Sequence, residues 1–220
     1  MIILSIKKNI EQIKESMPED VTLVAVSKTK PIEFLEEAYT AGIRDFGENK
    51  VQELTEKFEL FHKDVRWHFI GHLQTNKVKY IVDKAFLIHS LDSTKLLKEL
   101  EGQCSKNQIQ INTLIQINIG KEDTKYGFYE EQLNEVLNEV GKCNYVKIKG
   151  IMVIIPKGNE ESNRYYFKRT KNIFENIKKQ KYQNVTMEIL SMGMTHDYEI
   201  AIEEGATLVR IGEGIFGKRI

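Results

Sequence analysis

Short apolar runs rich in β-branched residues alternate along this chain with longer amphipathic stretches, and this alternation limits the fold more than any other feature. Runs of strand length occur at residues 21–27, 44–47, 67–70, 86–90, 113–119, 148–155, 186–190 and 208–211. Helical apolar faces lie between them, clearest at Leu133, Val136, Leu137 and Val140, and at Tyr166, Thr170, Ile173, Phe174 and Ile177. An additional N-terminal helix is predicted by the spacing of Ile6, Ile10, Ile13 and Met17.

The spacing of these runs predicts a parallel sheet. Successive strand ends are about 20 to 37 residues apart, which suits a strand followed by a crossover helix. Eight such units without a linker or composition break predict an α/β fold, a closed (β/α)8 TIM barrel forming a single domain over residues 1–220. The alternative is an open doubly wound sheet. In both folds the functional residues lie at the carboxyl ends of the strands.

Two helix starts carry side chains suited to capping free backbone N–H groups. Ser93 precedes the apolar residue Leu96, and Thr195 with Asp197 precedes the seventh predicted helix.

The charge balance argues against a polyanionic partner. Lys and Arg number 32 and Asp and Glu number 32, so no net field draws the chain to nucleic acid or an anionic membrane, and we expect a small ligand. The longest apolar run, residues 151–155, is far shorter than the roughly 20 residues of a membrane helix. Residues 1–17 carry Lys, Glu and Asn where a signal peptide would have an apolar core, so we expect no signal peptide. A cytoplasmic protein is expected, and its two cysteines, Cys104 and Cys143, predict neither a disulfide framework nor a metal site.

A lysine follows the first predicted strand directly. Lys28 comes after the apolar run 23–26, so its ammonium is placed at the barrel mouth, where partial desolvation would free the amine to form a Schiff base with a carbonyl. The alternative is a solvated lysine that begins a loop. Further polar side chains expected at the same rim are Glu48 and Asn49 after strand two, His72 after strand three and Asn118 after strand five.

Glycine-rich turns follow the seventh and eighth strands. Residues 191–195 (SMGMT) combine a hydroxyl, a flexible glycine and a helix start, and residues 210–214 (RIGEG) form the second turn. In barrels these two loops commonly bind phosphate. An amine at strand one and a phosphate site at strands seven and eight together suggest a phosphorylated aldehyde, above all pyridoxal 5′-phosphate.

Three other motifs receive ordinary structural interpretations. Residues 212–217 match G-x-G-x-x-G, but too little chain follows for a dinucleotide-binding unit. His68 and His72 lie on a strand and its exit, where four-residue spacing does not stack side chains, so we expect core or rim histidines. His89 and Ser90 are neighbours in a strand and should point to opposite faces.

Five ordered motifs across nearly the whole chain resemble the pyridoxal phosphate homeostasis protein family, relatives of the N-terminal barrel of alanine racemase. They are residues 25–31 (AVSKTKP), 46–49 (FGEN), 67–74 (WHFIGHLQ), 191–194 (SMGM), and 209–212 (VRIG) with 215–217 (IFG). The resemblance implies a protein that binds pyridoxal 5′-phosphate (PLP) and acts in vitamin B6 homeostasis.

The resemblance also implies roles for individual residues. Lys28 would hold the cofactor as a Schiff base and Asn49 would lie near its ring. The phosphate would be bound by Ser191, Gly193, Gly212 and the backbone of Glu213, and Arg210 would face the pyridine nitrogen. Two positions depart from the family pattern: Glu213 replaces a frequent Thr or Ser, which leaves the backbone N–H as the available contact, and His196 replaces Ser or Asp.

An arginine at the ring nitrogen would discourage carbanion chemistry, because a permanent charge there keeps the nitrogen unprotonated. We therefore expect a non-catalytic PLP carrier, a monomer, with apo PLP-dependent enzymes as candidate recipients. The alternative is a PLP-dependent amino-acid racemase whose second base is Tyr126, His72 or Tyr198. A third, remote alternative is a Schiff-base aldolase without cofactor.

Overall fold

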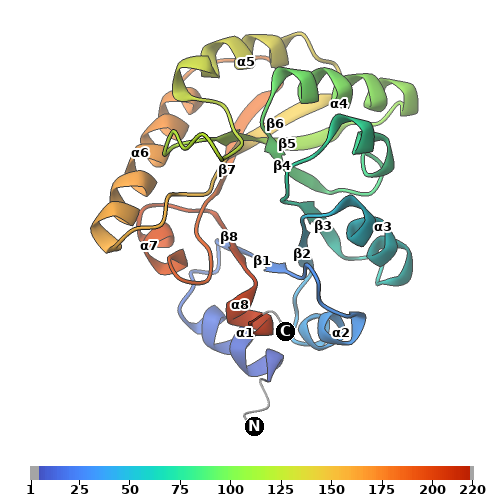
Figure 1. Cartoon of the computed structure of the whole chain (residues 1–220), viewed down its shortest axis with the longest axis vertical. Coiled ribbons are helices and arrows are strands. Elements are labelled where there is room, and N and C mark those ends of the chain that lie inside the picture. Colours follow the sequence, from blue (N-terminus) through green and yellow to red (C-terminus); the bar gives the residue numbers. More distant parts are fainter. Residues whose placement is uncertain (1–4, 219–220) are drawn as a thin grey trace.

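Eight parallel strands pair in sequence order in the computed structural model, which describes residues 5–218, and β8 pairs back with β1 to close a barrel (Figure 1). This closure confirms the predicted barrel and excludes the open doubly wound sheet. The strands are β1 (Thr22–Val26), β2 (Asp45–Glu48), β3 (Arg66–Phe69), β4 (Leu87–Leu91), β5 (Ile111–Ile117), β6 (Val146–Val153), β7 (Val185–Ser191) and β8 (Leu208–Ile211).

Helices surround the sheet on its outer side (Figure 1). They are α1 (Ile6–Glu15), α2 (Ile32–Thr40), α3 (Val51–Leu60), α4 (Thr94–Asn107), α5 (Leu133–Gly141), α6 (Glu160–Lys178), α7 (Tyr198–Glu203) and α8 (Glu213–Phe216), with 3-10 helices η1 (Thr75–Tyr80) and η2 (Glu130–Gln132). The crossover between β3 and β4 is the 3-10 helix η1 instead of an α-helix. The predicted N-terminal helix is α1, which buries Ile6, Ile10 and Ile13 and lies beside α8 (Figure 1). No described helix is long and apolar enough to cross a bilayer.

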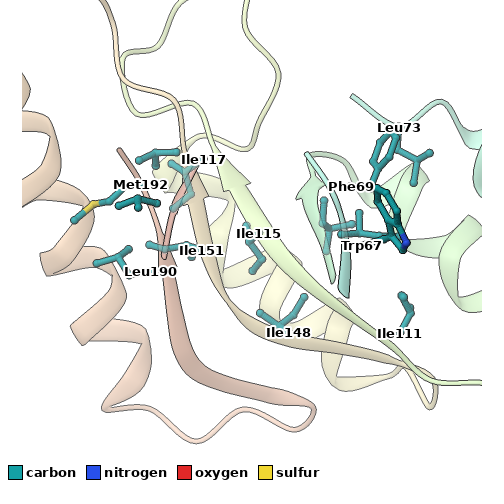
Figure 2. Close-up of a cluster of buried hydrophobic side chains, with 14 of the residues drawn as sticks. Trp67, Phe69, Leu73, Ile111, Ile115, Ile117, Ile148, Ile151, Leu190 and Met192 are labelled. Carbon is teal, nitrogen blue, oxygen red and sulfur yellow. The ribbon is translucent and has the colours of Figure 1, made fainter. Parts of the chain in front are cut away.

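Two separate groups of buried apolar side chains fill the molecule. The larger group joins the strands to the surrounding helices, and Figure 2 shows part of it, including Trp67 of β3, Ile115 of β5 and Leu190 of β7. The smaller group consists of Val24, Leu87, Leu114, Met152 and Leu208, from five different strands. Because successive residues of a strand point to opposite faces, this second group fills the barrel interior.

One predicted helix cap is confirmed and the other is wrong. The hydroxyl of Ser93 accepts a hydrogen bond from the N–H of Leu96 at 3.2 Å. Asp197 precedes α7, but its carboxylate accepts from the N–H of Met194 at 2.6 Å and makes no side-chain bond to the helix. The carbonyl of Met194 already accepts from the first N–H groups of this turn, so the helix start needs no side-chain acceptor.

A glycine forms the irregular point of β6. The register of β6 shifts between Ile148 and Gly150, and Gly150 has a φ of +153°. A Cβ at this position would lie 1.8 Å from the carbonyl oxygen of Ile189 on β7. The backbones of β6 and β7 therefore approach closely only because residue 150 has no side chain.

Replacing this glycine should destabilise the barrel. We expect Gly150→Ala to lower the free energy of unfolding by about 3 kcal/mol or more, from backbone strain and the clash with β7. Gly102 is the matched control, since it lies exposed in α4 and a methyl group added there would have no neighbouring atom within 4 Å. Gly102→Ala should raise the free energy of unfolding by up to about 1 kcal/mol. Urea unfolding of the wild type and the two variants measures both effects. Equal stability of Gly150→Ala and the wild type would show that the close approach of β6 and β7 does not require a glycine at residue 150.

Candidate functional site

A cavity of about 590 Å³ opens at the carboxyl ends of the strands. Its volume falls within the range of small-molecule sites. The lining side chains and turns come from most of the barrel strands: Val26, Lys28, Lys30, Asn49, Ile70, Gly71, His72, Gln116, Thr124, Lys125, Tyr126, Ile154, Met194, Thr195, His196, Arg210, Gly212, Glu213 and Gly217. Five of the seven residues predicted to bind the cofactor line it, namely Lys28, Asn49, Arg210, Gly212 and Glu213.

Two lysines after β1 line the cavity. Lys28 is half-buried and follows the buried residue Ser27, whose N–H donates to the carbonyl of Gly47 at 3.0 Å. Lys30 is held differently, since its Nζ lies 3.1 Å from the carbonyl oxygen of Phe216 and 3.3 Å from that of Gly217. Lys30 therefore fastens the end of α8 to the loop after β1.

A buried ion pair supports the turn that carries Lys28. The Nζ of Lys57, on α3, lies 2.7 Å from Oε1 of Glu48 and donates to the carbonyl of Ser27 at 2.8 Å. The hydroxyl of Ser27 donates to the same carboxylate oxygen at 2.6 Å. Burial raises the pKa of the Glu48 carboxyl, and the ammonium of Lys57 opposes that rise. The prediction that Glu48 lies at the rim is wrong, because this side chain turns outward to α3.

Asn49 lines the cavity and carries a buried acceptor oxygen. Its Oδ1 is buried and has no hydrogen-bond partner among the described residues. Asn49 is held by close packing against Gly71, where a Cβ would lie 2.3 Å from the carbonyl oxygen of Asn49. An unsatisfied buried amide beside a cavity is a position where a polar ligand atom would be stabilised.

The turns after β7 and β8 are joined to each other. The N–H of Arg210 donates to the carbonyl of Gly193 at 3.1 Å, and the N–H of Gly214 donates to the hydroxyl of Thr195 at 3.2 Å. Gly193 has a φ of +93°, and a Cβ there would lie 2.6 Å from that of Ala201. Gly193 itself does not line the cavity, whereas its neighbours Met194 and Thr195 do.

Backbone donors remain available at the second turn. Within residues 5–218, the N–H groups of Gly212 and Glu213 donate to no described acceptor. Such unpaired donors at adjacent positions suit an anion. The Glu213 side chain is exposed and carries its carboxylate at the edge of the cavity.

Arg210 and Ser191 are bonded to each other below the cavity. Arg210 is 4% exposed, and its Nη1 donates to the hydroxyl of Ser191 at 2.5 Å while Nη2 donates to the carbonyl of Val153 at 2.9 Å. Ser191 is fully buried and does not line the cavity. Burial lowers the pKa of Arg210 to about 10, which leaves the guanidinium charged at neutral pH.

The rim carries a histidine with an acidic partner. Nδ1 of His72 lies 2.6 Å from Oδ2 of Asp92, and its ring stacks on Tyr126 at 3.7 Å between centroids. Tyr198 does not line the cavity, and its hydroxyl bonds to that of Ser16 at 3.0 Å.

Strand β5 contributes Gln116 to the cavity lining, a residue that the sequence analysis did not predict there. Asn118 is buried, and its amide group bonds to the backbone of Glu122 and Lys125 in the following loop. The prediction that Asn118 lies at the rim is therefore wrong, since Gln116 lines the cavity instead. A glutamine flanked by isoleucines near the end of the strand was the available signal.

The two other histidines of the sequence motifs lie inside the barrel. His68 and His89 are buried and bonded to each other, and the Oγ of the neighbouring Ser90 has no partner among the described residues. His89 and Ser90 do not form a hydrogen-bonded pair, as expected for neighbours in a strand. The described residues hold no group of three or more His, Cys, Asp or Glu side chains that could bind a metal ion.

Comparison with known proteins gives one consistent family. Residues 3–219 match the family model described as alanine racemase, N-terminal domain. The pyridoxal phosphate homeostasis protein of Aquifex aeolicus is 46% identical over 199 residues, which cover 90% of this chain and 86% of the relative. The homologue from Pasteurella multocida is 36% identical and covers 98% of each chain.

A solved structure is similar along the whole barrel. PipY of Synechococcus elongatus, determined without PLP, superposes with a TM-score of 0.91 at 32% identity, covering 96% of this chain and 100% of that chain. The structure of PipY with PLP bound superposes with a TM-score of 0.86 over the same shares.

Removing Lys57 should destabilise the site in a pH-dependent way. In Lys57→Met the buried Glu48 loses its counter-charge, and we expect the free energy of unfolding at pH 7 to fall by about 3 kcal/mol or more. The pKa of Glu48 would rise further above its unfolded value. As the pH increases, Glu48 would therefore lose its proton at a lower pH in the unfolded chain than in the folded protein. The deficit in the free energy of unfolding should then grow from pH 5 to pH 7.

Urea unfolding at both pH values measures this effect. Lys50→Met is the control, because Lys50 is exposed and its nearest ion-pair oxygen, on Glu53, lies 3.8 Å away. Its cost should stay within about 0.5 kcal/mol at either pH. A Lys57→Met deficit of the same size at pH 5 and pH 7 would show that Glu48 is not its cause.

Proposed function

This chain belongs to the pyridoxal phosphate homeostasis protein family, built on the alanine racemase N-terminal barrel, and from that premise we propose that it binds PLP and acts in PLP homeostasis without robust catalysis. The observation that carries the proposal is a single cavity lined both by Lys28 and by the turn at Gly212 and Glu213. An amine and an anion-binding turn that follow the paired strands β1 and β8 and line one cavity suit an aldehyde that carries a phosphate.

The donors present in the cavity fit such a ligand. Lys28 would condense with the aldehyde to form a Schiff base, releasing one water molecule. The N–H groups of Gly212 and Glu213 would donate to the phosphate, and Asn49, which lines the same cavity, would lie near the ring. Arg210 lines the same cavity, and its guanidinium would face the pyridine nitrogen.

Three of the residues expected at the phosphate, Gly193, Gly212 and Glu213, would act through the backbone of the two turns. Gly193 holds the first turn against β8 through its carbonyl, and Gly212 leaves the second turn open to the cavity. The Ser191 hydroxyl already accepts from Arg210, so a phosphate contact there would require the side chain to change partners. The carboxylate of Glu213 repels an anion, which leaves its N–H as the attractive group.

The charge on Arg210 favours a carrier over an enzyme. Bound PLP supplies an electron-withdrawing ring, whose strength depends on protonation of the ring nitrogen. The pKa of Arg210, lowered by burial to about 10, still leaves a cation at neutral pH. A cation facing that nitrogen opposes its protonation and so weakens the ring as an electron sink. Apo forms of PLP-dependent enzymes are the expected recipients of such a carrier.

One observation favours a second candidate function, amino-acid racemisation. His72 lines the cavity and is held by Asp92, the arrangement of a general base with an orienting carboxylate. Tyr126 stacks on this ring and also lines the cavity, whereas Tyr198 does not. His72 is thus the base that a racemase built on this chain would use.

Replacing Lys28 tests the proposed attachment. Purified protein with PLP should absorb near about 420 nm, as protonated Schiff bases of PLP do, and borohydride should abolish the band. Lys28→Ala should lack both properties. Lys30→Ala is the matched control, because Lys30 lines the same cavity but holds backbone carbonyls, and it should keep the band. A borohydride-reducible adduct that persists in Lys28→Ala would overturn the assignment of the lysine.

Deuterium exchange separates the two candidate functions. The PLP-loaded protein incubated with L-alanine in deuterated water should exchange the α-proton far more slowly than about 10 per second, the ordinary enzyme median. His72→Gln should exchange at the same low rate, as followed by proton NMR. Exchange near the enzyme median that falls by about 100-fold or more in His72→Gln would establish the racemase instead.

A further inference from the structure

A continuous chain of hydrogen bonds crosses the inside of the barrel below the cavity. Starting from Arg210, Nη1 lies 2.5 Å from the Ser191 hydroxyl, which lies 3.0 Å from Nδ1 of His89. Nε2 of His89 lies 2.9 Å from Nδ1 of His68, and Nε2 of His68 lies 2.9 Å from Oδ1 of Asp45. All five side chains are less than a tenth exposed.

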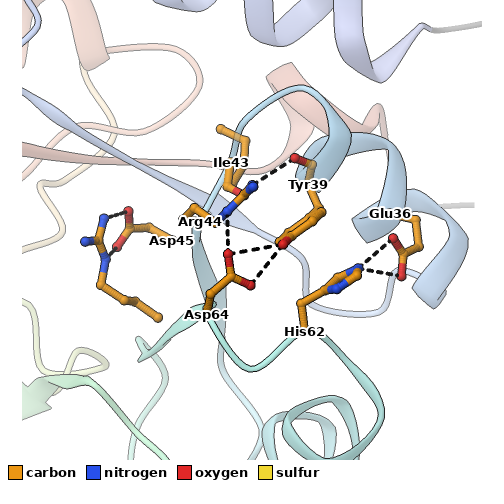
Figure 3. Close-up of polar contacts among 8 residues, drawn as sticks. Glu36, Tyr39, Ile43, Arg44, Asp45, His62 and Asp64 are labelled. Carbon is orange, nitrogen blue, oxygen red and sulfur yellow. Dashed lines mark hydrogen bonds and ion pairs between the residues drawn. The ribbon is translucent and has the colours of Figure 1, made fainter.

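The chain spans the barrel lumen. His89 is on β4 and Ser191 is on β7, and these strands are not neighbours in the sheet. Leu87 and Leu208, in the interior apolar group, are two residues before His89 and Arg210, so the polar side chains occupy the next layer of the same interior. At the end opposite Arg210, Asp45 also forms an ion pair with Arg66, accepting from Nε at 2.7 Å and from Nη2 at 2.5 Å. Figure 3 shows Asp45 in this ion pair.

The charges at the two ends determine where each proton lies. A guanidinium only donates, so the Ser191 oxygen accepts from Arg210. Burial disfavours the ionised form of Asp45, but hydrogen bonds from His68 and Arg66 hold its pKa below the ordinary value, so its carboxylate only accepts. Nε2 of His68 therefore carries a hydrogen.

Neutral rings satisfy the rest of the chain. Burial, with the nearby cation of Arg210, lowers the pKa of His89 well below its ordinary value. With both rings neutral, Nδ1 of His68 accepts from Nε2–H of His89, and Nδ1 of His89 accepts from the hydroxyl of Ser191. Every hydrogen then has an acceptor, and all the bonds run in one direction, from Arg210 to Asp45.

The reverse arrangement leaves a buried hydroxyl unsatisfied. If His68 were doubly protonated, His89 would have to accept at Nε2 and donate from Nδ1 to Ser191. The Ser191 oxygen would then accept from both His89 and Arg210, and its own hydrogen would have no acceptor among the described residues. An unmade hydrogen bond at a fully buried group is costly.

We propose that His68, His89 and Ser191 are positioning residues, which fix the orientation of the Arg210 guanidinium at the base of the cavity through a one-directional chain of hydrogen bonds anchored on Asp45. The consequence for cofactor binding rests on the proposed function, whereas the chain and its proton positions do not. Ser191 acts in this assignment on Arg210 and not on the phosphate.

Nitrogen NMR of the protein without cofactor tests the proton positions directly. In protein labelled with ¹⁵N in histidine, long-range nitrogen–proton correlations at pH 7 should show His68 and His89 as neutral rings with the hydrogen on Nε2. Single His→Asn variants assign the signals. A hydrogen on Nδ1 of His89, or a doubly protonated His68, would overturn the proposal whether or not PLP binds.

Side-chain arginine signals test the positioning. In protein without cofactor, a fixed Arg210 should give separate Nη–H resonances, and these should average in Ser191→Ala and in His89→Leu. His89→Asn keeps an acceptor near the Nδ1 position and should retain the separate signals. Ser90→Ala is the matched control, because Ser90 is an equally buried serine on β4 whose hydroxyl oxygen has no partner among the described residues.

PLP titration by absorbance then measures the consequence for the cofactor. His89→Leu should weaken PLP binding by about tenfold and shift the absorbance band, while His89→Asn and Ser90→Ala should resemble the wild type. Normal proton positions with no PLP binding in the wild type would reject the proposed function alone. Fixed Arg210 signals and unchanged PLP binding in both Ser191→Ala and His89→Leu would reject the positioning role.

Discussion

The pairing of β8 with β1 is the constraint on which the other features of this structure depend. Its register places Val24 opposite Arg210 and Ala25 opposite Ile211, so the loop after the first strand meets the loop after the last. This closure brings Lys28, which follows β1, and Gly212, which follows β8, into the lining of one cavity. The same closure creates the lumen that the hydrogen-bond chain from Arg210 crosses.

Local signals in the sequence were sufficient to predict the strands and many of the residues that line the cavity. The alternation of apolar runs and helical faces is a short-range pattern, and the predicted bounds of the last strand, 208–211, agree with β8. Because parallel strands all end on one side, residues such as Lys28, Asn49 and Glu213 could be assigned to one rim before their contacts were known. They do line one cavity.

Sequence periodicity does not show side-chain partners that lie elsewhere in the fold, and the wrong predictions for Glu48 and Asn118 have this cause. Glu48 follows the inward-facing Gly47, so the period of two turns it outward, and its partner Lys57 is a residue of the next helix. Asn118 bonds to a loop whose conformation no periodicity describes. The partners of Ser191 come from strands β4 and β8 and become visible only once the barrel is closed.

The polar layer inside this barrel is stabilised in a different way from the apolar layer beneath it. Five apolar side chains fill the lower interior, and they need only match each other in shape. The layer of His68, His89 and Ser191 is stable only when each donor meets an acceptor, which demands a fixed proton arrangement as well as a fixed packing. Side chains held in one arrangement in this way suit the wall of a binding site.

The cavity lining also gives this neutral chain an uneven charge distribution. Lys28, Lys30, Lys125 and Arg210 face a space into which only one carboxylate, that of Glu213, is contributed by the lining, although the whole sequence has a formal net charge of zero. At physiological salt such a field fades within about 8 Å, so it acts inside the cavity and at its entrance. A small anion that reaches the entrance would therefore be attracted before any specific contact forms.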